Sequence, residues 1–127
     1  MSKDLIRLMN ALFLPGVEAC RDAPWQPNMD VYRTPTGWLV KFELAGVRPE
    51  EIDLQVLGNR MTLRGKRCDT VLEASPKSRE PSLVQHRMEI AYGRFERTLE
   101  LPCDLKRAEI TTEYRDGLLL VRVNPEQ

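Results

Sequence analysis

The last third of the chain alternates apolar and polar residues with the period of a β-strand. Two sets of alternating positions follow one another, namely Phe95, Arg97, Leu99 and Leu101, then Ile110, Thr112 and Tyr114. Successive side chains of a strand point to opposite faces of a sheet, so each set shares one face. Pro102 lacks the N–H that a strand ladder needs and predicts the end of the first strand. Asp116-Gly117 predicts a type I′ hairpin, because both central positions of that turn need positive φ.

Earlier stretches repeat this pattern of strand and turn. Residues 25–66 form four β-rich segments, which are separated by turn signals at 34–37, 46–49 and 58–59. Residues 67–82 hold prolines and charges and predict an exposed loop, followed by a strand from about Leu83 to Ile90. Short strands at regular spacing with little helix predict an all-β fold, an immunoglobulin-like β-sandwich.

The N-terminal residues predict a different kind of structure. Apolar side chains recur with the i, i+3, i+4, i+7, i+8 spacing of an amphipathic helix at Leu5, Leu8, Met9, Leu12 and Phe13. Pro15-Gly16 predicts the end of this helix. So short a helix is marginal alone, and its apolar face either docks on the domain or stays available to a partner. We therefore divide the chain into an arm at 1–24, a domain at 25–124 and a short tail at 125–127.

Composition excludes several classes of function. The 127 residues carry 19 basic and 19 acidic side chains, a balance that argues against nucleic acid or an anionic membrane as a partner. No apolar run approaches the roughly 20 residues that span a bilayer. The three cysteines are odd in number and lack C-x-x-C spacing, so we expect no disulfide framework and a reducing, cytoplasmic location. One histidine and scattered thiols predict no metal site.

Catalytic motifs are missing from the sequence. It contains no G-x-x-x-x-G-K-[ST] phosphate loop, no nucleotide fingerprint and no histidine-centred triad. We predict that the protein is not an enzyme and needs no cofactor. The remaining catalytic alternative is a hydrolase that uses Cys103 or Asp30, although no oriented base is spaced to activate Cys103.

The ordered series of motifs resembles the α-crystallin domain of the small heat shock proteins, in the bacterial and plant type. F-x-R-x-x-x-L-P at 95–102 and D-G-L-L at 116–119 are similar to its C-terminal strands and hairpin. The segments 25–32, 37–47, 49–56, 59–66 and 86–90 resemble its other strands, so the likeness covers residues 24–124. It implies an ATP-independent holdase, which binds partly unfolded client proteins and prevents their aggregation, and which assembles with itself into dimers.

The resemblance assigns roles to three sets of residues. Client binding falls to the arm, with Leu5, Leu8, Met9, Leu12, Phe13 and Leu14. An edge groove that accepts apolar segments is formed by Ile52, Leu54, Val56, Ile110, Thr112 and Tyr114. The dimer interface contains Asp30, Tyr32, Leu83, His86, Met88, Ile90 and Arg97, with the strand at 83–90 exchanged between subunits. The alternatives are docking of the arm on the domain, core packing for about half of the groove residues, and an ordinary surface role for Arg97.

The chain departs from the family pattern in two places. Thr112 stands where alanine is usual, a tolerable change on a strand. The chain ends at Asn124-Pro-Glu-Gln127, without the usual I-x-I motif of a C-terminal extension, so we expect dimers or small oligomers and not a large shell. The alternative function is a CS-domain-like co-chaperone or adaptor, which has the same sandwich but binds a folded partner.

Overall fold

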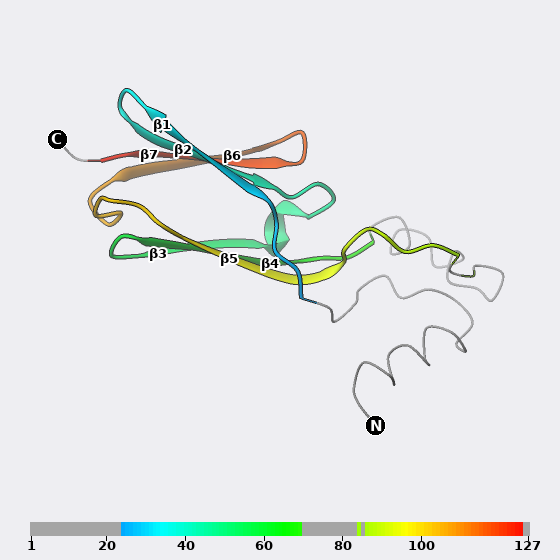
Figure 1. Cartoon of the computed structure of the whole chain (residues 1–127). Helices are drawn as coiled ribbons and strands as arrows, with labels where there is room; N and C mark the ends of the chain where they lie inside the picture. The colour runs from blue at the N-terminus through cyan, green and yellow to red at the C-terminus, as the bar shows by residue number, and fades with distance from the viewer. Residues whose placement is uncertain (1–23, 70–83, 85, 126–127) are drawn as a thin grey trace.

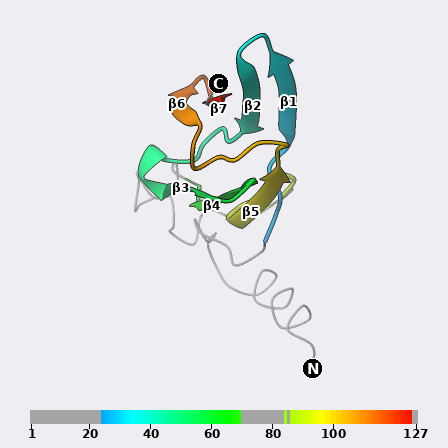
Figure 2. The same cartoon turned by 90° about the vertical axis from the view of Figure 1, so that its left-hand side faces the viewer.

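Two antiparallel sheets stack face to face in the computed structural model, which describes residues 24–69, 84 and 86–125. One sheet has the order β1-β2-β7-β6 and the other β3-β4-β5. Figure 2 shows one sheet above the other, with β6 over β3 on one side and β1 over β5 on the opposite side. The strands are β1 (Met29–Thr34), β2 (Gly37–Glu43), β3 (Ile52–Leu57), β4 (Arg60–Arg67), β5 (Gly93–Glu100), β6 (Glu109–Arg115) and β7 (Leu118–Asn124). The predicted all-β sandwich is confirmed.

The core lies between the sheets and is built from alternate residues of the central strands. Val40 and Phe42 of β2 are 0% and 1% exposed, and Val40 is paired with the fully buried Val121 of β7. From the other sheet, β4 contributes Met61 and Leu63, which are equally buried. This alternation places the apolar faces of the two sheets against each other, as the strand period requires.

The hairpin predicted at Asp116-Gly117 joins β6 and β7. Asp116 has φ 54° and Gly117 has φ 78°, so both central residues occupy the left-handed region that a type I′ turn needs. A Cβ atom added at Gly117 would lie 3.0 Å from the Cα of Ala45, so glycine is also needed for the close approach of the neighbouring loop. β5 ends at Glu100, two residues before Pro102, as predicted.

Two segments differ from the sequence prediction. Residues Pro49–Glu51, expected at the start of a strand, form the 3₁₀ helix η1, and β3 begins at Ile52. Proline suits the first helical position because its missing N–H would be unpaired there in any case. The strand expected at 83–90 is absent from the described residues 84 and 86–90, because a strand needs a second backbone edge and this segment pairs with none among the described residues.

Candidate functional site at the free edges of the sandwich

The predicted groove residues lie on β3 and β6, the outer strands of the two sheets on the same side of the sandwich (Figure 2). All except Thr112, which is exposed, are half-buried and pack against the core. We call these six positions the β3–β6 seam: Ile52, Leu54, Val56, Ile110, Thr112 and Tyr114. Among the described residues, no strand pairs with the outer edge of either β3 or β6. The seam therefore combines apolar side chains with unpaired backbone groups.

Tyr114 fixes one end of this seam. Its hydroxyl lies 2.7 Å from the carbonyl oxygens of both Leu44 and Val47, which belong to the loop after β2. Burial raises the pKa of Tyr114 above its ordinary value, so the neutral hydroxyl that donates to these carbonyls is favoured. The loop and the strand are thus held together where the seam begins.

A second free edge is that of β1, on the opposite side of the sandwich. The predicted interface residues Asp30 and Tyr32 are exposed on this strand, and Val31 between them is 38% exposed. The ammonium of Lys41 lies 5.0 Å from the ring centre of Tyr32 and gives the ring a cation–π neighbour. β1 pairs only with β2 among the described residues, so its outer backbone groups are available to another strand.

The segment before β5 carries apolar side chains into solvent. Val84, Met88 and Ile90 are 74%, 40% and 62% exposed, and they alternate along the chain together with His86. In an extended conformation these four side chains would share one face. Arg87 and Glu89, which form an ion pair at 3.5 Å, fall on the alternate positions. Leu83 and residues 1–23 of the arm, with the six predicted client-binding residues, lie outside the described residues.

Arg97 is half-buried and faces the interior side of β5 with Phe95 and Leu99. Its Nη1 donates a hydrogen bond of 3.2 Å to the carbonyl oxygen of Pro27 in the same chain. The single chain thus supplies one of the partners that a buried guanidinium needs. The contact ties the segment before β1 to β5.

Arg67 joins three distant segments, and the sequence analysis did not identify it. Its Nε and Nη2 donate to the carbonyl oxygen of Ala91 at 2.8 and 2.6 Å, and its Nη1 donates to that of Ala45 at 3.1 Å. The guanidinium carbon lies 4.0 Å from the ring centre of Trp25 and 5.8 Å from that of Tyr92. Burial lowers the pKa of Arg67. No local pattern reveals such a residue, because its partners are distant in sequence.

We expect Arg67→Ala to destabilise the domain by about 2–4 kcal/mol, because it leaves two carbonyls without their donor and removes the stacking on Trp25. Arg67→Lys should recover little, since an ammonium cannot donate in a planar fork. The matched control is Arg64→Ala on the same strand, which removes an exposed ion pair with Glu96 and should cost less than about 1 kcal/mol. Urea denaturation measures all three, and equal losses for Arg67→Ala and Arg64→Ala would contradict this role.

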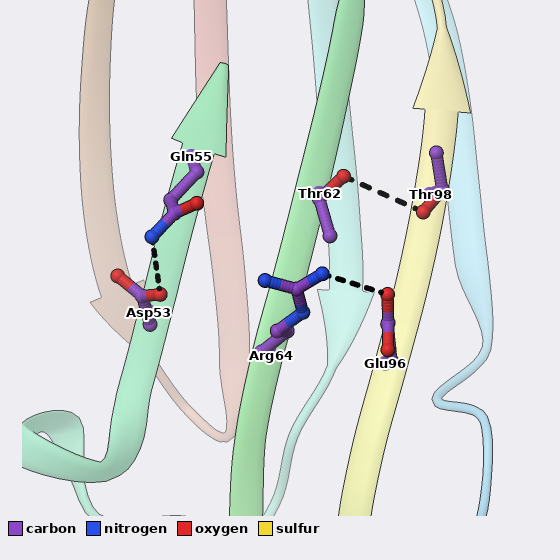
Figure 3. A network of polar contacts seen from close by, with 6 residues as sticks. All are labelled: Asp53, Gln55, Thr62, Arg64, Glu96 and Thr98. Atoms are coloured by element: carbon purple, nitrogen blue, oxygen red, sulfur yellow. Dashed lines mark hydrogen bonds and ion pairs between the residues drawn. The ribbon is translucent and has the colours of Figure 1, made fainter. Parts of the chain in front are cut away.

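The outer face of the β3-β4-β5 sheet contrasts with the free edges. Figure 3 shows Arg64 reaching Glu96 and Thr62 beside Thr98, pairs that span 3.2 and 3.4 Å between neighbouring strands. Arg60 reaches Glu100 in the same way at 2.9 Å. Polar groups on this face pair with one another, and among the described residues Leu57 at the end of β3 is its one large exposed apolar side chain. The candidate interaction sites are therefore the edges and not this face.

One cysteine expectation is wrong. Cys68 is disulfide-bonded, whereas Cys103 is a free, half-buried thiol that packs against the core. Within residues 24–69, 84 and 86–125, no group of histidine, cysteine, aspartate and glutamate side chains could hold a metal ion. None of the described helices is long and apolar enough to cross a membrane.

Comparison with known proteins agrees with this sandwich. The model of the Hsp20/alpha crystallin family matches residues 30–127. The chain belongs to the Hsp20/alpha crystallin family. Small heat shock protein C2 of Rickettsia felis is 26% identical over 76% of this chain and 58% of its own length. The 17.6 kDa class I heat shock protein 3 of Arabidopsis thaliana is 32% identical over 76% of this chain and 57% of its own length. The chain thus spans less than two thirds of these relatives.

Solved structures share the fold. The hspA protein from Xanthomonas axonopodis superposes with a TM-score of 0.62 at 25% identity, covering 82% of this chain and 97% of the other. Heat shock protein 16.0 from Schizosaccharomyces pombe gives a TM-score of 0.67 at 24% identity over 81% and 89% of the two chains, which bears on the fold alone. These relatives and solved structures are named as heat shock proteins.

Proposed function

We propose that this member of the Hsp20/alpha crystallin family is an ATP-independent holdase, which covers the apolar surface of partly unfolded clients and so prevents their aggregation. The observation that carries the proposal is the β3–β6 seam, where apolar side chains on two outer strands lie beside unpaired backbone edges. A client segment bound there would gain main-chain hydrogen bonds and apolar contacts together.

The physical driving force needs no nucleotide. Apolar surface that is removed from water contributes about 25 cal/mol per Å², so a few apolar client side chains supply several kcal/mol. Such a contact is non-directional and therefore tolerates many client sequences. Strand addition supplies the geometry, because unpaired N–H and C=O groups of an outer strand accept any extended backbone.

The proposed assembly unit is a homodimer in which the segment at 83–90 pairs with β1 of the partner subunit. Exposed Val84, Met88 and Ile90 on alternate positions favour this arrangement, as does the unpaired edge of β1 next to Asp30 and Tyr32. Pairing would cover the apolar side chains of this segment and the unpaired backbone edge of β1 in each subunit. Leu83 and His86 belong to the same proposed interface, and Arg97 would contribute from β5.

The arm is proposed as a second client-binding element. Its helical spacing places Leu5, Leu8, Met9, Leu12 and Phe13 along an apolar face, and Leu14 follows them in the sequence. An apolar helix that re-packs on different partners suits a holdase, because unfolded clients share no fixed shape. Deleting residues 1–14 would test this contribution separately from that of the seam.

A paired substitution on β6 tests the seam. Thr112 and Thr111 are neighbouring exposed threonines, but Thr112 lies on the seam side with Ile110 and Thr111 on the outer face. We expect Thr112→Arg to weaken the suppression of aggregation of a heat-labile model client without ATP by about 5-fold, because it places a charge in an apolar contact. Thr111→Arg should retain full activity.

Light scattering of the heated client measures both variants. Equal suppression by the two variants would remove the seam from the client-binding surface. A wild-type protein that suppresses nothing, but retains one stoichiometric folded partner in a pull-down, would instead indicate the adaptor function.

A further inference from the structure

The two ends of the β3–β6 seam are built from different loops. At one end, the N–H of Leu44 donates to the carbonyl oxygen of Gly117 at 2.7 Å, so the loop that leads into η1 lies against the β6–β7 hairpin. At the other end, the N–H of Leu105 donates to the carbonyl oxygen of Gly58 at 2.9 Å, so the loop before β6 lies against the β3–β4 turn. We call these the η1 end and the Gly58 end. Figure 1 shows η1 beside the start of β3.

Charge separates these two ends. The η1 end consists of residues 48–53 and 113–116, which carry five acidic side chains (Glu50, Glu51, Asp53, Glu113, Asp116) and two basic ones (Arg48, Arg115). The Gly58 end consists of residues 57–59 and 104–109, which carry two acidic and two basic side chains. Of the seven charged residues at the η1 end, only Glu51 is half-buried, and the other six are exposed.

The local ion pairs leave the excess negative charge in place. Arg115 reaches Glu113 at 3.7 Å and offsets one carboxylate. Asp53 accepts a hydrogen bond of 3.1 Å from Gln55, an uncharged side chain of its own strand. Arg64, which is opposite Asp53 in the strand register, directs its Nη2 to Glu96 instead, as Figure 3 shows.

The opposite side of the sandwich lacks this excess. β1 and β5, which form that side, carry three acidic and three basic side chains between residues 29–34 and 93–100. The whole chain has no net charge. The acidic excess is therefore found at the η1 end of the seam and not at the Gly58 end or on β1 and β5.

We infer that the β3–β6 seam selects extended apolar segments that carry lysine or arginine beside their apolar residues, with the basic residues at the η1 end. This inference rests on the proposed function, since it names the chemistry of the segment that the seam accepts. The apolar positions of the seam hold the segment, and the carboxylates around η1 attract its basic flank and repel an acidic one. Complementary charge of this kind sets specificity more than total affinity.

The probes are two synthetic peptides with the same isoleucine–threonine–isoleucine core, one flanked on each side by two lysines and the other by two glutamates. We expect the lysine peptide to bind the full chain about 10-fold more tightly at 0.01 M salt, where the Debye length is about 30 Å. At 1 M salt the Debye length is about 3 Å, and the two affinities should agree within about 2-fold. Fluorescence anisotropy of labelled peptides measures all four affinities.

A pair of charge-matched variants locates the effect. Glu50→Gln with Asp53→Asn removes two carboxylates at the η1 end and should reduce the preference for lysine at low salt to about 3-fold or less. Asp30→Asn with Glu100→Gln removes two exposed carboxylates from β1 and β5, on the opposite side of the sandwich, and should leave the preference unchanged.

The outcomes separate this inference from the proposed function. Equal binding of both peptides at low salt would overturn the charge selection while the seam remains a binding site. Equal loss of preference in both double variants would show a general surface effect and would also overturn it. Absence of binding by either peptide at either salt concentration would overturn both this inference and the seam as a site.

Discussion

Substituting glutamate for both Met88 and Ile90 should convert the proposed dimer into a monomer. The two side chains are 40% and 62% exposed in the single chain and share one face of the segment before β5. Pairing with a partner's β1 would bury them, and each would contribute about 1.5 kcal/mol or more. Loss of both apolar contacts weakens association by at least about 100-fold. The added carboxylates weaken it further, because the interface would remove them from water without a charged partner. Light scattering coupled to size-exclusion chromatography, at tens of micromolar, distinguishes the two masses.

The control for this prediction is Arg87→Glu. It changes the net charge by the same amount as the double substitution, since a positive side chain becomes negative, but Arg87 occupies the alternate position of the segment. A dimeric Arg87→Glu variant beside a monomeric double variant would support the exchanged strand. If the double variant keeps the dimer mass, dimerisation uses another surface. A monomeric wild-type chain at these concentrations would overturn the dimer itself.

Features that depend on neighbouring residues could be predicted from the sequence. Alternation in 95–101 and 110–114 indicated which side chains share a face, and the structure confirms Phe95 and Leu101 as core residues. Asp116-Gly117 indicated its own turn type, because positive φ is a local requirement. The period of the pattern and the chemistry of the turns thus accounted for all seven strands, to within a few residues at their ends.

Features that depend on distant residues could not be predicted in this way. Arg67 contacts Ala91 and Trp25 only because β4, the start of β5 and the segment before β1 converge. The bond from Arg97 to Pro27 joins residues 70 positions apart. For the segment at 83–90 the obstacle is different, because the strand proposed there needs a partner edge that a single chain does not provide.

The seam lies between these two cases. Alternation showed that Ile52, Leu54 and Val56 share a face, but it left open whether they are core or surface. The structure shows that they are half-buried and pack against the core from an outer strand, while their role in a binding groove stays a prediction. The position of a strand within its sheet decides this exposure, and that position is a property of the topology and not of the strand's own sequence.

The face on which a side chain lies predicts a large difference between two leucines of one sheet. Leu63 lies on the central strand β4 and is fully buried, whereas Leu57 at the end of β3 is 71% exposed. Leu63→Ala should lower the free energy of unfolding by about 2–5 kcal/mol, because it removes buried methyl groups and leaves a cavity between the sheets. The same substitution at Leu57 should change it by less than about 0.5 kcal/mol. Domains of this size have about 5–15 kcal/mol in total, so the first variant loses a large share of its stability. Urea denaturation compares the midpoints at equal slope, and a Leu57→Ala variant as unstable as Leu63→Ala would show that the outer face of β3 is covered in solution.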